Sequence, residues 1–336
     1  MEFGKTARTE TVDFTLPPDD PITDEMLAGL NPSAAGPVRI HVGCAIWGRK
    51  DWVGKVYPQG AKERDFLSYY VRQFNTIELN TLFYSLQPKE VIGRWASLAG
   101  SDFRFCPKFS NTISHLRQLR NVEKETELFI DHMHCFGASL GPSFLQLSDR
   151  FAPSEASLLQ EYARRLPRDF RACIELRQED WFPQRPHRPS AASRVSSSGM
   201  ASHIPPFDTM DPSAVRDTWR TFLELGIGTV ITDTSGRRDV LHMKLTAPVA
   251  FIRFVGNSGL PTDYTRVDAW VGRIGTWIDK GLRDIYFFVH NHEERNSPEL
   301  CKYAIEKFNE RCGLDLAPPQ LEEESQQGPA DQLSLF

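Results

Sequence analysis

The chain has 336 residues, a formal net charge of -5 and an isoelectric point near 6.0. A protein with this charge has no overall positive field to attract nucleic acid, so binding to DNA requires a local patch or a recruiting partner. A hydrophobic content of 40% supports a substantial core, and this length suits one α/β barrel or two smaller domains. Because the six cysteines include no C-x-x-C pair and no apolar run is long enough to span a membrane, we expect a cytoplasmic protein with reduced thiols.

Polar segments divide the chain. Residues 1–37 lack periodicity and are predicted to be a disordered leader. Residues 183–210 begin with a stretch rich in Ser, Pro and Arg (183–206) and are predicted to be a mobile insertion. Residues 315–336 are predicted to be a flexible tail. Residues 38–314 are therefore expected to form one domain.

Short apolar, β-rich runs alternate with helical patterns through this domain. Strands covered on both faces are expected to be continuously apolar, as these runs are. The predicted strands are 40–47, 75–80, 103–109, 143–148, 171–177, 228–234, 249–256 and 284–290. The predicted helices are 61–74, 88–100, 122–137, 153–166, 212–226, 263–281 and 297–313.

Eight strands alternating with helices predict a single (β/α)8 TIM barrel, with the long insertion after the fifth strand. Only the connection at 235–245 is a poor helix candidate. An open doubly wound sheet is the alternative. The absence of a G-x-G-x-x-G loop after the first strand makes that alternative weaker.

A barrel places its ligand site where the strands end. Charged side chains inside apolar strands are costly unless they are paired or face a cleft, so charges at several strand ends together favour a ligand site. The alternative is a set of internal ion pairs, such as Glu175 with Arg253, that only closes the barrel. The strand-exit residues are Trp47, Glu78, Asn80, Lys108, Gln146, Glu175, Arg177, Asp233, Arg253, His290 and Asn291.

Three kinds of chemistry are compatible with these residues. Lys108, Arg177 and Arg253 suit an anionic group such as phosphate. Glu78 and Glu175 are candidates for an acid and base pair that cleaves a glycosidic or phosphodiester bond. A divalent metal is also compatible with this residue set. Its candidate ligands are Glu78, Glu175, Asp233 and His290.

Seven ordered blocks resemble the domain of unknown function 72 family, the YecE-like proteins of bacteria and archaea. The resemblance covers about residues 39–312 and implies a TIM barrel. The blocks are VGCAIWGRKDWVGKVYP, FNTIELNTLFYSLQP, FRFCPKFSNTISH, GPSFLQLSDRF, CIELRQEDWF, AFIRFVGN and YFFVHNH.

The resemblance extends to individual site residues. The first block departs from the family pattern at Ala45 and Ile46, and the fourth at Ser148 and Asp149. Similarity to barrels of the endonuclease IV and sugar isomerase type implies a hydrolase or an isomerase. The candidate catalytic residues are Glu78, Glu175 and His115. The positions that match family motifs are Glu78, Asn80, Tyr84, Lys108, His115, Gln146, Glu175, Arg177, Trp181, Arg253 and Asn291.

The last five residues, QLSLF, are similar to the short peptide by which bacterial DNA polymerases and repair proteins bind the sliding clamp. A flexible tether would deliver Leu335 and Phe336 to an apolar pocket, while Gln332 bonds at its edge; Leu333 completes the motif. A tail that folds back on the barrel is the alternative. A clamp peptide would explain how an acidic protein works on DNA.

We therefore expect a barrel that binds a phosphate-bearing ligand and acts as a hydrolase in DNA repair, recruited by the clamp. The first alternative is a non-catalytic module that binds a nucleotide or a protein. The second is a metabolic isomerase or hydrolase acting on a phosphorylated sugar.

Overall fold

The computed structural model describes residues 4, 6, 9–33, 36–182 and 212–322. Each predicted strand and each predicted helix is present, while α1 and α3 are additional. The strands are β1 (Arg39–Cys44), β2 (Thr76–Leu79), β3 (Arg104–Pro107), β4 (Ser143–Gln146), β5 (Ala172–Glu175), β6 (Gly228–Asp233), β7 (Ala250–Gly256) and β8 (Asp284–Asn291). The helices are α1 (Pro21–Ala28), α2 (Phe66–Gln73), α3 (Thr81–Tyr84), α4 (Lys89–Leu98), α5 (Glu123–Met133), α6 (Ala156–Arg165), α7 (Pro212–Leu225), α8 (Pro261–Asp279) and α9 (Ser297–Cys312).

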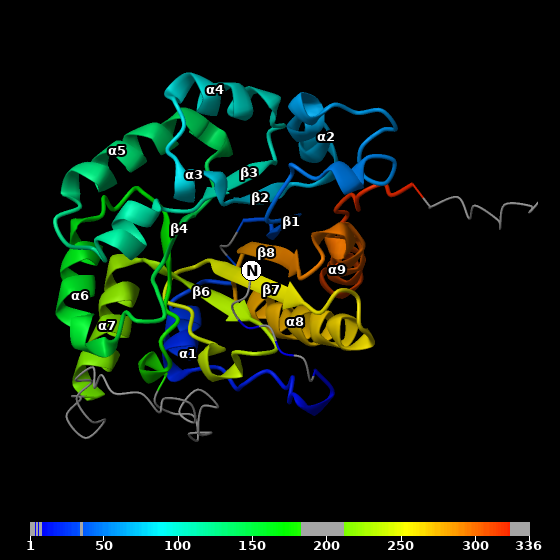
Figure 1. Ribbon diagram of the computed structural model, residues 1–336. Helices are drawn as coiled ribbons and strands as arrows, with labels where there is room; N and C mark the ends of the chain where they lie inside the picture. Colours follow the sequence, from blue (N-terminus) through cyan, green and yellow to red (C-terminus); the bar gives the residue numbers. More distant parts are fainter. Residues whose placement is uncertain (1–3, 5, 7–8, 34–35, 183–211, 323–336) are drawn as a thin grey trace, which may run out of the picture.

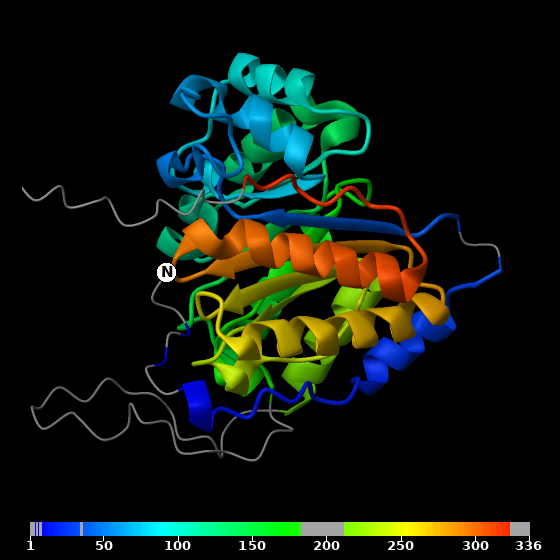
Figure 2. The ribbon, with the colours of Figure 1, turned by 90° about the vertical axis from the view of Figure 1, so that its right-hand side faces the viewer.

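The strands pair in parallel, which gives an α/β fold with helices outside the strands (Figure 1). Six strands form one sheet in the order β1-β8-β7-β6-β5-β4, and β2 pairs with β3. Two isolated parallel bridges, Phe105 to Leu140 and Lys108 to Phe144, join the β3 region to the β4 region. Figure 2 shows the strands running in the same direction.

Side chains connect β1 to β2, which share no backbone ladder. Asn75 accepts a hydrogen bond from Val42 N (2.8 Å) and donates one to Ile40 O (2.9 Å). The Tyr70 hydroxyl accepts from Cys44 N (2.8 Å) and donates to the carbonyl of Thr76. A Cβ atom at position 43 would lie 2.1 Å from that same carbonyl, so this approach requires glycine.

The inner face of the strands, turned away from the helices, carries an apolar layer beneath a polar one. Successive residues of a strand point to opposite faces, so a residue two positions later lies on the same face, nearer the strand exit. The buried apolar cluster is Cys106, Phe144, Cys173, Val230, Ala247, Val249, Phe251, Tyr286 and Phe288. Two positions after six of its members stand Lys108, Gln146, Glu175, Thr232, Arg253 and His290.

The N-terminal segment is ordered where we expect a disordered leader, so that prediction is wrong for residues 9–33. The β6–β7 connection carries only the short turn Arg238–Val240, as its sequence predicts, and α1 lies on this side between α7 and α8 (Figure 1). The buried Thr23 hydroxyl donates to Met243 O (2.6 Å) and accepts from Leu245 N (2.7 Å). The order of residues 9–33 was not predicted because polar contacts of this kind produce no apolar periodicity in the sequence.

The C-terminal tail is also ordered over its first residues. Leu316 N bonds to Asn309 Oδ1 (2.9 Å), and Glu322 N bonds to Lys55 O (2.9 Å), so the prediction of a flexible tail is wrong for 315–322. The predicted insertion at 183–210 and the peptide at 332–336 lie outside the described residues. No helix in the described ranges is long and apolar enough to cross a membrane.

Replacing Thr23 by Val tests the role of the N-terminal segment. The change removes a buried hydroxyl that satisfies a carbonyl and an N–H, so we expect the free energy of unfolding to fall by about 2 kcal/mol. Urea denaturation measures it. Thr265→Val, at an exposed position of α8, is the control and should cost about 0.5 kcal/mol or less. Equal effects of the two changes would contradict a structural role for the segment.

Candidate functional site

Arg253 on β7 bridges two glutamates, one from the β2–β3 ladder and one from the six-stranded sheet. Its Nε and Nη2 donate to Glu78 of β2, each at 2.8 Å, and its Nη1 donates to Glu175 of β5 at 3.0 Å. The three side chains are at most 1% exposed. The Glu175–Arg253 ion pair that the sequence suggested is therefore present, with Glu78 as a second partner.

Both glutamates are held in the charged form. Burial raises the pKa of Glu78, but Arg253 and the neighbouring His290 imidazole outweigh it, so the pKa lies well below its ordinary value. Burial likewise raises the pKa of Glu175, but Arg177 and Arg253 lower it further, to about 2. A general acid must carry a proton at the working pH, so neither carboxylate suits that role near neutrality.

Further polar partners occupy the remaining oxygen positions of the two carboxylates. Such bonds fix both groups and leave them little freedom to exchange protons with a ligand. Glu78 accepts from Asn80 Nδ2 (2.9 Å) and contacts His290 Nε2 (2.8 Å). Glu175 accepts from Arg177 Nε (2.6 Å), Gln146 Nε2 (2.7 Å) and Thr232 Oγ1 (2.9 Å).

Lys108 lies beside this network and is linked to it through Gln146. Its Nζ donates to Gln146 Oε1 (2.8 Å) and lies 4.1 Å from the centre of the Phe83 ring. Among the residues that the structure describes, Lys108 forms no ion pair. Burial, and then the charge of Arg253, lowers the pKa of Lys108 to about 7. Its amine is therefore partly neutral at physiological pH.

His115 lies near the same lysine in the short helical turn Thr112–Leu116. Its Nδ1 shares a hydrogen bond with the Ser114 hydroxyl (2.8 Å), and its ring contacts Phe83 edge to face at 5.1 Å. Burial, together with the positive charges of Lys108 and Arg177, lowers its pKa. His115 therefore carries a neutral imidazole at neutral pH.

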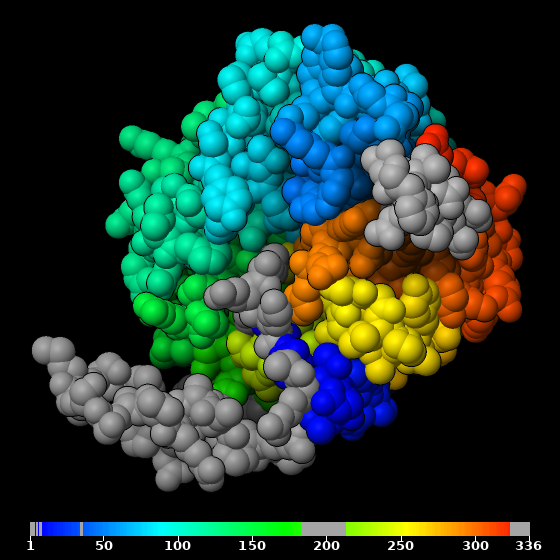
Figure 3. Space-filling view, turned by 45° about the vertical axis from the view of Figure 1, so that its right-hand side comes forward, coloured from blue at the N-terminus to red at the C-terminus, as the bar shows by residue number. Residues whose placement is uncertain are grey.

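Two predicted aromatic residues, Trp47 and Tyr84, pack on other aromatic side chains. Trp47 is half-buried and packs edge to face on Trp95 of α4 at 5.4 Å. Tyr84 is 77% exposed and contacts Phe83, which is the aromatic residue that faces Lys108. Figure 3 shows the surface at the ends of the strands, where the segments after β1 and β2 (blue to cyan) face those after β7 and β8 (yellow to orange).

The structure does not bring Asp233 and Asn291 into the cluster. Asp233 pairs with Arg266 (3.0 Å) and Arg238 and accepts from Trp270 Nε1 (2.7 Å), behind the strands. Asn291 accepts from Ser258 N (3.3 Å). Each is the residue after an inner-face position, so its side chain points to the opposite face. His290, which the sequence predicts at its strand end, reaches the cluster, as does Thr232, which the sequence analysis missed. The alternation of side chains along a strand is the signal that could have identified Thr232.

The donor set does not fit a divalent metal. The two glutamates face a guanidinium, and Asp233 lies on the other face of its strand. Within the described residues no three side chains of His, Cys, Asp or Glu are grouped in a way that would hold a metal ion. We therefore derive no metal step.

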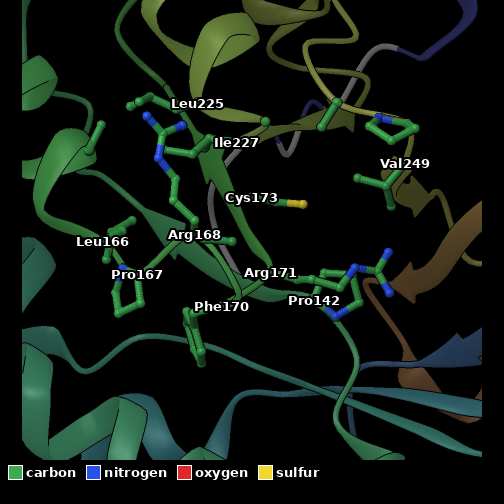
Figure 4. Close-up of a pocket in the computed structure, with 15 residues that line it drawn as sticks. Pro142, Leu166, Pro167, Arg168, Phe170, Arg171, Cys173, Leu225, Ile227 and Val249 are labelled. Carbon is green, nitrogen blue, oxygen red and sulfur yellow. The ribbon is translucent and has the colours of Figure 1, made fainter.

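A cavity of about 200 Å³ opens at the other end of the strands (Figure 4). It is lined mainly by apolar side chains such as Leu166, Phe170 and Val249, with Arg168 and Arg171 beside them. The apolar layer separates this cavity from the Arg253 network. The two ends of the strands are thus chemically independent.

Comparison with known proteins identifies the family. The family described as "Protein of unknown function DUF72" matches residues 41–204 and 208–324. The chain belongs to the DUF72 family. This DUF72 protein is 27% identical over 266 residues to the UPF0759 protein YecE of Escherichia coli K12 and of strain O157:H7, which covers 78% of this chain and 89% of each relative.

Solved DUF72 structures share the fold. A DUF72 family protein of Enterococcus faecalis V583 matches with a TM-score of 0.58 at 16% identity, covering 83% of this chain and 99% of that one. A DUF72 family protein of Thermotoga maritima MSB8 matches with a TM-score of 0.54 at 18% identity, covering 82% and 100%. At these identities the likeness concerns the fold alone.

Replacing Arg253 by Met tests the network. The change leaves two buried carboxylates without their shared guanidinium, so the free energy of unfolding should fall by about 3–5 kcal/mol at pH 7. Urea denaturation measures it. Arg311→Met, which breaks an exposed ion pair with Asp279, is the control and should cost about 1 kcal/mol or less.

The cost should also depend on pH. In the native protein, Glu175 has a pKa of about 2, against about 4.3 when unfolded, so its contribution is present above that value and is lost as the pH falls toward 2. In the variant, Glu78 loses Arg253, the charge that lowers its pKa most, so its pKa rises and the variant loses less stability than the native protein as the pH falls. A deficit that stays constant from pH 7 to pH 3 would contradict the ion-pair account.

Proposed function

We infer that the eight parallel strands form one closed (β/α)8 barrel. Three observations support this inference. The six-stranded sheet and the β2–β3 ladder are joined on one side by the Lys108–Phe144 bridge and on the other by Asn75. Arg253 of β7 reaches both Glu78 of β2 and Glu175 of β5, as opposite strands of a barrel do. The polar cluster is then the mouth of the barrel.

We propose that this mouth binds a phosphate-bearing ligand. The observation that carries the proposal is the charge balance: two carboxylates, Glu78 and Glu175, are matched by two guanidiniums, Arg253 and Arg177, which leaves Lys108 as an additional cation. Lys108 is 6% and Arg177 9% exposed, whereas Arg253 is fully buried. An anion arriving from solvent would meet the first two, and Arg177 would offer it a planar guanidinium.

We assign proton exchange to Lys108 and His115 rather than to the glutamates. A catalytic acid or base works best with a pKa near the operating pH. The pKa of Lys108 is about 7, whereas that of Glu175 is about 2. In this assignment Glu78 and Glu175 position the cluster through Arg253. Such a site is compatible with the hydrolase predicted from the sequence and with an isomerase.

We further propose that the terminal peptide at 332–336 recruits the protein to a DNA sliding clamp, which would place the barrel in DNA repair. The support comes from the sequence: Gln332, Leu335 and Phe336 stand at the spacing of the clamp peptide. With a net charge of -5 the protein has no overall positive field for DNA, so a clamp peptide would supply the localisation.

Calorimetric titration with inorganic phosphate and with glycerol 3-phosphate tests the anion site. Lys108→Met should weaken binding about tenfold or more, because it removes a charge-assisted hydrogen bond. The matched control Lys50→Met removes an exposed lysine and the same charge, and should bind as the native protein does. Affinity should fall as the pH rises through about 7, because Lys108 loses its proton. Equal binding by the two variants would contradict the proposal.

A pull-down with immobilised sliding clamp tests recruitment. Deleting residues 332–336 should abolish retention, and replacing Leu335 and Phe336 by Ala should do the same. Ser334→Ala, inside the same peptide, should be retained. If the deletion left retention on the clamp unchanged, the proposal would be contradicted. The same would hold if the native protein were not retained.

A further inference from the structure

We propose that the amine of Lys108 condenses with the carbonyl carbon of a phosphate-bearing aldehyde or ketone and holds it as a Schiff base. The inference rests on the proposed anion site and names the class of compound that the site takes. Two sources share this chemistry: a free sugar phosphate, and the open-chain deoxyribose of an abasic site in DNA.

The position of the lysine amine supports the proposal. Gln146 donates its amide N–H to Glu175 (2.7 Å), which turns its carbonyl oxygen toward Lys108 (2.8 Å). That oxygen only accepts hydrogen bonds, so the lysine donates to it whether charged or neutral. One N–H is thereby fixed, and the lone pair of the neutral amine is left for an electrophile.

The surroundings also favour a nucleophilic amine. Lys108 is buried beside the guanidiniums of Arg253 and Arg177, whose positive charge opposes protonation of the amine. The nearest carboxylates are already bound to those guanidiniums, so they give the lysine no ion pair. The Phe83 ring, 4.1 Å from Nζ, favours the ammonium form, but the burial and the two guanidiniums outweigh it. Lysines activated in this way form Schiff bases.

The reaction balances without an external oxidant or reductant. The amine lone pair attacks the carbonyl carbon, a proton moves from nitrogen to oxygen, and the carbinolamine then loses water when a second proton is added. The products are an iminium ion on Lys108 and one water molecule. We assign the passage of these protons to His115, whose neutral ring shares a hydrogen bond with Ser114. The guanidinium of Arg177, which bonds to Glu175 through Nε, would supply a second positive charge for the phosphate.

Borohydride trapping tests the proposal with the full-length protein. One arm uses glyceraldehyde 3-phosphate and the other a duplex oligonucleotide with a single abasic site, each with sodium cyanoborohydride. Intact-mass and peptide mass spectrometry locate the reduced adduct. Random labelling follows exposure and would favour Lys50, whose side chain is 76% exposed. We expect a single adduct at Lys108 instead, although that residue is only 6% exposed.

The adduct should be lost in Lys108→Met and should persist in Lys50→Met. Excess inorganic phosphate should lower the yield of adduct by competing for the site. The adduct should form faster as the pH rises through about 7, because Lys108 loses its proton. The compound that labels Lys108 at the lower concentration, glyceraldehyde 3-phosphate or the abasic duplex, identifies the source of the carbonyl group. Adducts confined to exposed lysines in both arms would overturn the inference. If phosphate binding in the titration still depended on Lys108, the anion site would stand while the Schiff base would not. If phosphate did not bind at all, the proposed function itself would fail.

Discussion

The burial of Arg253 between Glu78 and Glu175 is the constraint on which the rest of the site depends. A fully buried guanidinium is tolerated only when its donors are bonded and its charge is matched. Here one side chain of β7 satisfies carboxylates from β2 and β5, which ties together strands that do not pair directly. The same arrangement pairs both carboxylates of the cluster with guanidiniums, so within the described part of the chain Lys108 lies beside two guanidiniums and forms no ion pair.

The chemistry proposed for the polar cluster follows from this distribution of charge. The glutamates, which sequence motifs suggest as acid and base, are fixed in the charged form by their neighbours. The lysine, which sequence motifs suggest only as an anion contact, has the pKa nearest neutrality among these groups, about 7. Beneath the polar layer, the apolar cluster around Phe144, Phe251 and Phe288 fills the interior between the strands.

Much of this architecture can be predicted from the sequence because strand and helix patterns alternate clearly and strand ends carry charges. The sequence did not show which of two adjacent residues at a strand end points to the inner face, because that depends on which residues of the strand face inward. Asp233 and Asn291 are the conspicuous polar residues, yet Thr232 and His290 share the inner face with Val230 and Phe288.

The sequence also failed to predict that residues 9–33 are ordered, and the reason is different. Thr23 and Asp20 stabilise this segment through contacts with the β6–β7 connection, more than 200 residues away, and local composition does not report such contacts. The pairing of Glu78 with Arg253 is equally non-local. The sequence shows that both charges are present, but only the fold shows that each neutralises the other.

The protonation of Lys108 tests the central claim most directly. Nuclear magnetic resonance of protein labelled in its lysine side chains, with Lys108 assigned by comparison with Lys108→Arg, gives the titration of the amine. The account predicts a midpoint near 7, far below the ordinary value of about 10.4. A midpoint near 10 would show that Lys108 is an ordinary ammonium and would contradict the assignment of reactivity to this residue.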